Sequence, residues 1–322
     1  MSALYAELLK RTEEEIKRIE LPNSPSNLYD PIRYIMSLGG KRVRPVLTLL
    51  GAKLYSGSYE SAIAQAMAVE VFHNFTLVHD DMMDEAALRR QVPTVHKKWN
   101  ESIALLSGDG MLVLAYQLLA KSDPNRVSRL MQVFSKTALE VCEGQQLDMD
   151  YAEMETVKMD DYLEMIRLKT AVLLSGSLKI GAIQAGAPDE DLDRLTVFAE
   201  SMGLVFQIQD DYLDACGGEE FGKEQGGDII EGKRTWLTIK AFELGNDFQA
   251  NRLRKAFDSL SDTERVAEVM AIYSELEIDR LAKSRVAELS MEAISVLNEI
   301  KGDQEAKDTL EWLVNKLVKR QV

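Results

Sequence analysis

Two aspartate-rich motifs contain the residues whose types and spacing could do chemistry. Asp-Asp-Met-Met-Asp occupies positions 80–84, and Asp-Asp-Tyr-Leu-Asp occupies positions 210–214. Residues i and i+4 of a helix lie on the same face, so the first and last aspartates of each motif come close together. Carboxylates gathered in this way repel one another unless a cation lies among them. Magnesium accepts carboxylate oxygens and completes its coordination with water and substrate phosphates, so each motif is a candidate magnesium site.

Chance is a poor explanation for two such motifs. The chain has 23 aspartates among its 322 residues, so the three-aspartate pattern is expected roughly 0.1 times. Both motifs also continue apolar helical runs, which places their carboxylates on helices with buried faces. A third acidic segment, 160–164, instead follows a polar stretch, and Asp161 and Glu164 have the spacing of a capping box. We interpret that segment as a helix start.

The overall charge disfavours nucleic acid as a partner. The chain has 38 basic and 53 acidic residues and a net charge of −15, whereas affinity for phosphate backbones comes from clustered positive charge. An anionic substrate would therefore need a site whose local sign is reversed by metals and a few bases. No segment has eighteen consecutive apolar residues, so we expect no membrane span. The N-terminus lacks a signal-peptide pattern, and the two cysteines have no metal spacing, so we expect reduced, packed thiols in the cytoplasm.

The apolar periodicity predicts an all-α protein. Glycine and proline breaks separate the helical runs, none of the breaks is long enough for an interdomain linker, and strand-like alternation is essentially missing. We therefore expect a single domain over 1–322, built as a large helical bundle. The glycine-rich stretch 217–232 after the second motif is a candidate mobile lid. The expected helices span 3–19, 28–37, 45–54, 58–85, 101–121, 124–149, 160–185, 189–215, 233–244, 248–259, 262–298 and 303–320.

Two basic segments could bind an anionic substrate. In Gly-Gly-Lys-Arg-Val-Arg-Pro at 39–45, Gly39 suits a helix end and Pro45 suits the first turn of the next helix. Lys41 and Arg44 would then stand at a helix N-terminus, which favours anions, although a solvated basic turn is an equal alternative. Arg89 and Arg90 follow the first motif directly and could clamp a diphosphate.

Other candidate residues are more isolated. Lys169 and Thr170 interrupt a long apolar helix, where a lysine more often extends its charge to solvent. Lys223 and Lys233 flank the glycine-rich stretch, and Asp228 between them could order it. No histidine has zinc-ligand spacing; His73, nearly two turns before Asp80, is the histidine best placed to touch a ligand.

Taken together, these motifs resemble the trans-isoprenyl diphosphate synthases, also called polyprenyl synthetases. Gly-Gly-Lys-Arg-Val-Arg-Pro, Asp-Asp-Met-Met-Asp followed by Leu-Arg-Arg, Lys-Thr, Phe-Gln-Ile-Gln-Asp-Asp-Tyr-Leu-Asp and the two later lysines occur in that family's order over nearly the whole chain. The resemblance implies a prenyltransferase with the all-α isoprenoid synthase fold, a central active-site cavity and a homodimeric state. It implies head-to-tail condensation of isopentenyl diphosphate with an allylic diphosphate.

The resemblance also assigns residues. Asp80, Asp84 and Asp210 resemble ligands of three magnesium ions on the allylic diphosphate, which Asp81 and Asp214 would support through hydrogen bonds or water. Thr170 and Gln207 match positions whose oxygens face the developing carbocation. The residues that resemble the allylic diphosphate site are Arg89, Lys169, Lys223 and Lys233, and those that resemble the isopentenyl diphosphate site are Lys41, Arg44, His73 and Arg90.

The chemistry of the family accounts for this set of residues. Ionisation of an allylic diphosphate develops negative charge that metals and bases stabilise, and water must be excluded from the carbocation. The departing diphosphate can take the proton, so no side-chain nucleophile is required. Phe75, five positions before Asp80, would close the product tunnel beside the medium-sized Thr76. We therefore expect a fifteen- or twenty-carbon product, with geranylgeranyl diphosphate favoured over farnesyl diphosphate; ordinary core packing is the alternative role for Phe75.

Three other classes of protein are less compatible with the sequence. A class I terpene cyclase would pair one aspartate motif with an Asn/Ser/Glu metal motif and would not need the basic motif at 39–45. A regulatory subunit of a heteromeric prenyl synthase typically lacks some of the six carboxylates that this chain has. A di-iron bundle would need Glu-x-x-His pairs, which are missing from suitable helices.

Overall fold

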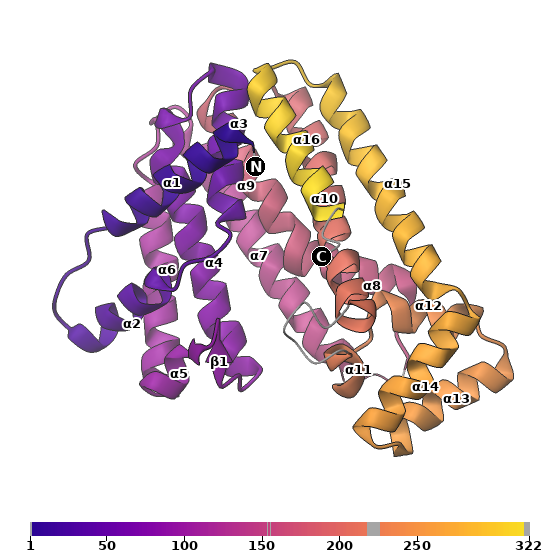
Figure 1. Cartoon of the computed structure of the whole chain (residues 1–322). Helices are drawn as coiled ribbons and strands as arrows, with labels where there is room; N and C mark the ends of the chain where they lie inside the picture. The colour runs from indigo at the N-terminus through magenta and orange to yellow at the C-terminus, as the bar shows by residue number, and fades with distance from the viewer. Residues whose placement is uncertain (1, 153, 155, 218–225, 319–322) are drawn as a thin grey trace. The chain divides into compact units, whose positions relative to one another are not determined.

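The protein is described from a computed structural model that covers residues 2–152, 154, 156–217 and 226–318 (Figure 1). The chain divides into two compact units. Unit 1 comprises Met1–Lys136, Gly176–Leu192 and Lys301–Thr309, and unit 2 comprises Thr137–Ser175, Asp193–Ile300 and Leu310–Val322. The division falls inside four helices, which are α7 (Val127–Ala152), α9 (Val172–Gln184), α10 (Asp189–Cys216) and α16 (Gln304–Val318). The expectation of a single domain stays a prediction.

Unit 1 is built around α4, which is apolar on nearly every face and ends in the first aspartate motif. Figure 1 shows α6 beside it, and the two helices have extensive contacts. The close approach needs a glycine, because a side chain at Gly108 on α6 would collide with the ring of His79 on α4. The helices confined to unit 1 are α1 (Ala3–Lys17), α2 (Ser26–Ser37), α3 (Val43–Ser56), the 3-10 turn η1 (Glu60–Ala62), α4 (Ile63–Met83), α5 (Val95–Lys98) and α6 (Glu101–Leu119).

A short hairpin follows α4. Its strands β1 (Leu88–Arg89) and β2 (Val92–Pro93) are antiparallel, and a two-residue turn with φ of 53° at Arg90 and 66° at Gln91 joins them. Two successive positive φ values match the twist of a tight hairpin. The sequence predicted a turn here but not strands, since two-residue strands are too short to alternate.

By length and composition alone, α6 could cross a membrane; 39% of its most apolar 18-residue stretch is buried. It packs against α4 and α2 in unit 1. Leu105, Leu106 and Val113 nevertheless remain 50%, 61% and 58% exposed. This helix therefore has one face in the core and one apolar face outside it.

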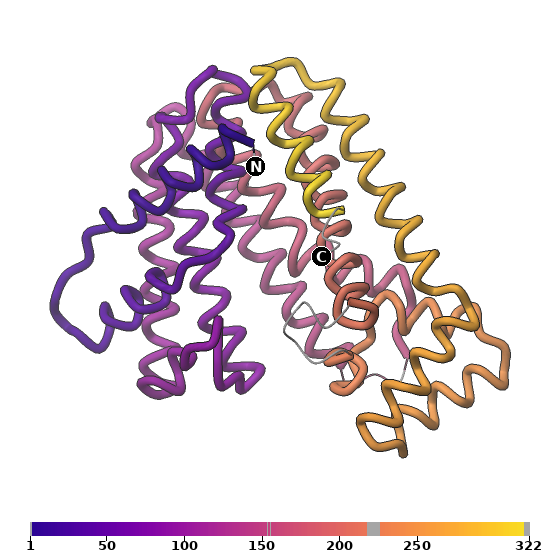
Figure 2. Tube along the Cα trace, in the orientation of Figure 1, coloured from indigo at the N-terminus to yellow at the C-terminus, as the bar shows by residue number. Residues whose placement is uncertain are grey.

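Unit 2 is also helical. Figure 2 shows α13 and α14 as a helical hairpin, in agreement with their contacts. The core includes Tyr162, Trp236 and Tyr273, and Leu317 and Val318 at the end of α16 pack against it, so the C-terminal segment is docked at least that far. The elements confined to unit 2 are α8 (Met159–Ile166), the π-helical turn η2 (Arg167–Ala171), α11 (Gly227–Ile230), α12 (Trp236–Leu244), α13 (Asp247–Ser259), α14 (Asp262–Glu275) and α15 (Ile278–Glu299).

The all-α class is confirmed, but two expected helices are interrupted. The run 160–185 contains the π-helical turn η2 between α8 and α9, and the run 262–298 breaks at Leu276–Glu277, where Glu277 has φ of 53°. The acidic segment 160–164 does lie at a helix start, although Glu164 bonds Arg167 and forms no capping box.

The expectation of two packed thiols is wrong for Cys142, which is exposed on α7; Cys216 is half-buried.

Candidate active site

The first aspartate motif forms the last turn of α4. Asp84 caps the helix, and its N–H donates to the carbonyl of Asp80 at 2.9 Å. Asp80 is half-buried, Asp84 is exposed and Asp81 is buried. The i, i+4 pair can therefore meet a ligand from solvent, whereas Asp81 faces the protein.

Asp81 binds Arg89 of the hairpin. The Nε of Arg89 lies 2.9 Å and 2.8 Å from the two carboxylate oxygens of Asp81, and its Nη2 lies 2.7 Å from Oδ1. The same Nη2 lies 3.7 Å from Asp80 Oδ2. A charge-assisted, multiply bonded pair of this kind fixes geometry as well as energy. The predicted metal-supporting residue and the predicted diphosphate-binding residue thus hold each other at the end of α4.

The basic motif lies at the junction of α2 and α3. Gly39, with φ of 61°, follows the end of α2, and Arg42, with φ of 46°, caps α3, so the predicted helix end and helix start are confirmed. Lys41 is exposed. Arg44 Nη1 lies 3.2 Å from His73 Nε2 on α4.

Arg90 covers this turn from the hairpin. Its Nη1 donates to the carbonyl of Leu38 at 3.2 Å, and a side chain at Gly40 would meet Arg90 Nη2 at 2.9 Å. Gly40 has φ of 154°. The glycine therefore leaves room for the guanidinium, and Arg90 lies beside the turn that carries Lys41.

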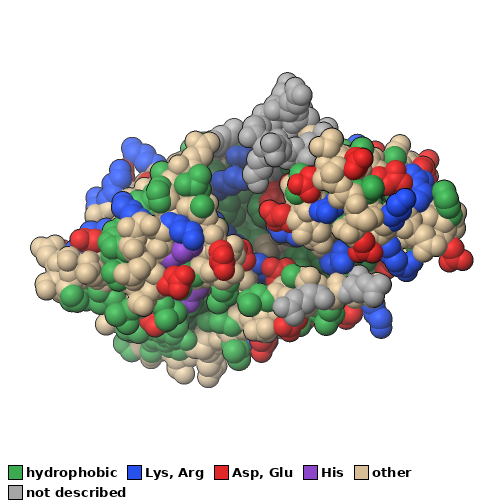
Figure 3. Space-filling model, turned by 90° about the horizontal axis from the view of Figure 1, so that it is seen from below, with side chains coloured by type: hydrophobic (Ala, Val, Ile, Leu, Met, Phe, Trp, Pro, Cys, Tyr) green, Lys and Arg blue, Asp and Glu red, His purple; other side chains and the backbone are tan. Residues whose placement is uncertain are grey.

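The electrostatics of this cluster favour an anion. Burial lowers the pKa of His73 well below 6.5, and the positive charges of Arg44, Arg90, Arg89 and Arg42 lower it further. His73 is consequently neutral at pH 7. Burial also lowers the pKa of Arg44 to about 10, which still leaves it charged. Figure 3 shows histidine, basic and acidic side chains close together on the side of the molecule that is seen from below. A site of locally positive charge in a chain of net charge −15 is expected to attract anions.

The second aspartate motif lies near the end of α10. Asp211 is buried and accepts hydrogen bonds from the hydroxyl of Tyr162, the N–H of Trp236 at 3.0 Å and Nε2 of Gln207 at 3.1 Å. Burial raises the pKa of Asp211 to about 6, against the effect of these donors. Asp211 therefore joins α10 to α8 and α12. Asp210 is half-buried.

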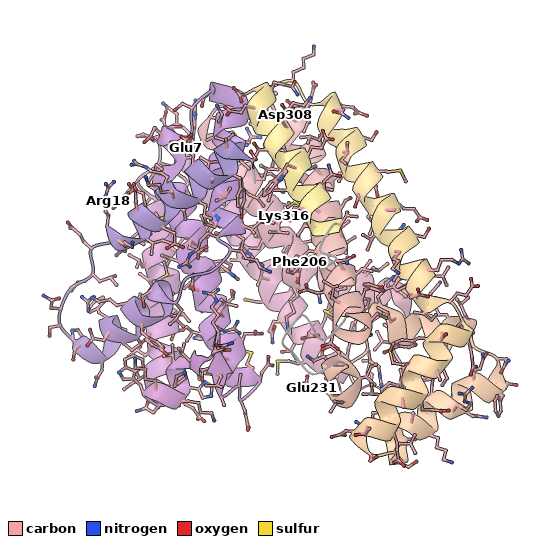
Figure 4. All side chains as sticks on the ribbon, in the orientation of Figure 1. Glu7, Arg18, Phe206, Glu231, Asp308 and Lys316 are labelled. Atoms are coloured by element: carbon pink, nitrogen blue, oxygen red, sulfur yellow. The ribbon has the colours of Figure 1, made fainter. Side chains whose placement is uncertain are left out.

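Asp214 organises the segment that begins α11. Its Oδ2 accepts from the N–H of Asp228 at 2.8 Å, and its carbonyl accepts from the N–H of Gly226 at 2.8 Å. Lys233 lies 3.0 Å from Asp228 and 2.8 Å from Glu231, which Figure 4 labels. Burial lowers the pKa of Lys233, but these two carboxylates raise it by more. These contacts agree with the expectation that Asp228 orders this segment. Lys223 lies outside the described residues.

Lys169 and Thr170 lie in the π-helical turn η2. Such turns are rare and are frequent at functional sites. Gly144 on α7 permits this turn, since a side chain there would collide with the backbone of Leu168 and Lys169. Lys169 Nζ binds Asp148 Oδ2 at 2.6 Å. Sequence reasoning missed Asp148, because nothing in a single sequence links it to a lysine 21 positions away.

Phe75 lies in an aromatic layer within unit 1. Its ring centroid is 5.5 Å from that of Phe72 and 4.7 Å from that of His79. Phe72 in turn stacks edge-on to Phe134 at 5.2 Å. The Thr76 hydroxyl donates to the carbonyl of His73 at 2.8 Å. Phe75 is only 8% exposed, so its ring is packed within this aromatic layer.

The carboxylates suit a metal that shares its coordination with a substrate. Among the described residues, no three His, Cys, Asp or Glu side chains lie close enough to hold a metal ion by themselves. Magnesium is usually held by one or two carboxylates with waters and substrate phosphates, so the half-buried Asp80 and the exposed Asp84 fit such an ion.

Comparisons with known proteins identify the family of the chain. Residues 25–276 match the family model for polyprenyl synthetases. The geranylgeranyl diphosphate synthase of Methanosarcina mazei is 40% identical over 279 residues, covering 85% of each protein. A short-chain isoprenyl diphosphate synthase of Methanothermobacter thermautotrophicus is 33% identical and covers 98% of this chain and 97% of its own.

The fold comparison is equally extensive. A crystal structure of a geranylgeranyl pyrophosphate synthase superposes with a TM-score of 0.93 and 40% identity, covering 100% of both chains. The match covers all the described elements that carry the aspartate and basic motifs. The chain therefore belongs to the polyprenyl synthetase family and is a prenyltransferase with the isoprenoid synthase fold.

Proposed function

We propose that this enzyme condenses isopentenyl diphosphate with allylic diphosphates head to tail, releases diphosphate and makes geranylgeranyl diphosphate as its main product. The observation that carries the proposal is the cluster of two cationic side chains, Arg44 and Arg90, with the neutral His73 of α4, the helix that ends in Asp80 and Asp84. An enzyme that only ionises an allylic diphosphate has no need of this second anion site. Farnesyl diphosphate is the alternative product.

The allylic diphosphate is assigned to the aspartate motifs. Asp80, Asp84 and Asp210 would hold three magnesium ions, with Asp81 and Asp214 acting through Arg89 and the α11 segment. The bound ions would supply charge stabilisation for the departing diphosphate. Arg89, Lys169, Lys233 and Lys223 would add hydrogen bonds to the same group, where negative charge develops.

The second substrate is assigned to the basic turn. Lys41, Arg44 and Arg90 would bind the isopentenyl diphosphate, and His73 would donate or accept a hydrogen bond as a neutral ring. Because Gln207 donates its amide N–H to Asp211, its Oε1 is left to stabilise the carbocation, together with Thr170. The proton lost after coupling would pass to the departing diphosphate, so no further base is needed.

Product length is assigned to Phe75. Its ring is backed by Phe72, which is itself backed by Phe134, so the floor of the tunnel cannot yield easily. Thr76 is smaller and leaves room beside it. A twenty-carbon product fits a floor made by one aromatic residue better than a floor made by two.

We also propose a cytoplasmic homodimer in which the exposed face of α6 is the contact. Leu105, Leu106 and Val113 are each at least half exposed on this face, and a dimer would remove them from water. Light scattering on the Leu106→Glu variant should then report a monomer. Leu244→Glu in unit 2, at a leucine 48% exposed, is the matched control and should remain dimeric.

Product analysis tests the proposed reaction. Purified enzyme, magnesium and labelled isopentenyl diphosphate are incubated with each allylic diphosphate in turn, and the products are separated by chain length. A twenty-carbon product is expected, and chelation of the metal should abolish it. Absence of condensation with every primer contradicts the proposal and favours a subunit that works only with a partner.

A further inference from the structure

Arg42 has no place in the proposed substrate contacts, although it lies between Lys41 and Arg44, which both have one. Arg42 follows the exposed Lys41 and precedes Arg44 by two positions, yet its side chain is 1% exposed. Its Nη1 lies 2.5 Å from Glu70 Oε1, its Nε donates to Glu13 Oε1 at 2.8 Å, and its Nη2 donates to the carbonyl of Met36 at 3.0 Å. All three guanidinium nitrogens therefore bind protein groups.

This arrangement is costly, which argues for a role. Arg42 has φ of 46°, a conformation that costs a residue other than glycine about 1 kcal/mol or more. Its partner Glu70 is also 2% exposed, and burying an ion pair gains little net stability compared with an apolar pair. Glu70 Oε2, Arg44 Nε and Asn74 Oδ1 have no hydrogen-bond partner in the described structure. Such a cluster is better explained by a need to position neighbouring residues than by a gain in the stability of the fold.

The pair fixes the basic turn to the helix of the first aspartate motif. Glu70 lies on α4, three residues before His73, and Asn74 Nδ2 donates to Glu70 Oε1 at 3.0 Å. Burial raises the pKa of Glu70, while Arg42, Asn74 and Arg44 favour its ionised form. Through Glu70, Arg42 sets where Lys41 and Arg44 stand relative to His73.

Helix α1 holds the same turn from its other side. The Tyr5 hydroxyl donates to the carbonyl of Lys41 at 3.0 Å, and Glu13 binds Arg42. Figure 4 labels Glu7 and Arg18 on or beside this helix. Two side chains of α1 thus contact the backbone or the guanidinium of the turn.

We propose that Arg42 and Glu70, supported by Tyr5 and Glu13 of α1, are positioning residues that hold Lys41 and Arg44 in register for isopentenyl diphosphate. The inference rests on the proposed function, because it assumes that substrate at this turn. None of the four residues touches the substrate. They act by fixing the backbone from which the two substrate-binding side chains project.

Steady-state kinetics of Arg42→Lys and Glu70→Gln test the proposal. Lysine keeps the charge but has a single nitrogen, which cannot reach the three separate acceptors that Arg42 binds. Glutamine keeps the shape but loses the charge. The KM for isopentenyl diphosphate should rise about tenfold or more, as for other residues that orient ligand-binding groups. The KM for the allylic substrate and kcat at saturation should change less than about threefold. Arg252→Lys is the matched control, because Arg252 also binds two glutamates, Glu268 at 2.6 Å and Glu275 at 2.7 Å.

Two further variants keep the test decisive. The double variant Arg42→Lys/Glu70→Gln should have a KM for isopentenyl diphosphate no higher than that of the more impaired single variant, because both substitutions break the same interaction. Tyr5→Phe removes the hydroxyl that donates to the carbonyl of Lys41 and keeps the ring, so it should fold normally and still raise the KM for isopentenyl diphosphate severalfold. Equal increases in both KM values, or a Tyr5→Phe variant with wild-type kinetics, would overturn the proposal. If the wild type condenses nothing, the proposed function fails first, and calorimetric binding of isopentenyl diphosphate to wild type and Tyr5→Phe then decides this inference.

Discussion

Arg89 contacts both carboxylate oxygens of Asp81, so the second aspartate of the first motif holds the hairpin rather than facing solvent. Asp80 and Asp84 are the proposed metal ligands, so the three carboxylates of the motif would have different tasks, although they are chemically identical. In the second motif Asp211 likewise binds protein groups, Tyr162 and Trp236, but so does the outer Asp214, which accepts from the N–H of Asp228.

Asp80→Asn should therefore cost more activity than Asp81→Asn. Loss of a group that stabilises developing charge typically lowers kcat by about 100- to 1000-fold, whereas loss of a residue that orients such a group costs about 10- to 100-fold. Asp81→Asn should in addition lower the free energy of unfolding by about 1–3 kcal/mol, because Arg89 loses its charged partner. Kinetics at several magnesium concentrations and urea denaturation measure the two effects. Asp30→Asn, at an exposed aspartate paired with Arg33, is the control, and equal losses for Asp80→Asn and Asp81→Asn would refute the division of tasks.

Asp211→Asn should keep the fold but disturb Gln207. An asparagine oxygen in the place of Oδ2 can still accept from Tyr162 and Trp236. Its NH2 group then faces Gln207 Nε2, so the Gln207 amide must flip and present N–H groups where its oxygen should stabilise the carbocation. We expect kcat to fall about tenfold, which corresponds to a loss of roughly 1.4 kcal/mol of transition-state stabilisation. The KM values should change little.

A double variant checks this reasoning. Asp211→Asn combined with Gln207→Leu should be no slower than Gln207→Leu alone, because the flipped amide is then absent. Calorimetry should show a Tm close to that of the wild type for Asp211→Asn. A variant that unfolds, or one whose loss adds fully to that of Gln207→Leu, would show that Asp211 acts in another way.

The sequence predicted those parts of the fold and site that local patterns determine. Helical periodicity located the long helices, and Gly39 and Pro45 marked the junction that carries Lys41 and Arg44, because helix ends depend on nearby residues. The break at Glu277 was missed, since no glycine or proline marks it. The π-helical turn was also missed, because it depends on a glycine in another helix, Gly144.

The partners of the site residues could not be predicted either. The resemblance gives Asp81 a supporting role without naming its partner and gives Asp211 no role; that they bind Arg89 and Tyr162 is decided by tertiary contacts. The role of Arg42 was hidden for the same reason. A buried and an exposed arginine are indistinguishable in a basic motif until the positions of Glu13 and Glu70 are known.

Phe75→Ala should lengthen the product beyond twenty carbons. Removing the ring opens space next to Phe72, and a growing prenyl chain can occupy a cavity that water fills poorly. Phe75→Leu should give a smaller increase, because it removes less volume. Chain-length analysis of the products reports both effects.

A matched loss of core volume elsewhere separates specificity from stability. Phe198→Ala in unit 2 removes a fully buried ring and should destabilise the enzyme by about 3–5 kcal/mol, without changing product length at a temperature where it stays folded. If Phe75→Ala makes the wild-type product, the floor lies at another residue of α4.

His73 should make the stability of the enzyme depend on pH. Its folded pKa is lowered by burial and then by the surrounding arginines, while its unfolded pKa is near 6.5. As the pH falls through 6.5, His73 binds a proton in the unfolded state but not in the folded state. Stability from this source is therefore present above pH 6.5 and is lost below it, by at most about 1.4 kcal/mol per pH unit.

Urea denaturation of wild type and His73→Gln between pH 5 and 7.5 measures the difference in the free energy of unfolding. This difference should grow in favour of His73→Gln as the pH falls, because glutamine does not titrate. Parallel curves for wild type and His73→Gln would mean that His73 has the same pKa in the folded enzyme as in the unfolded chain, and so is not held neutral by the fold.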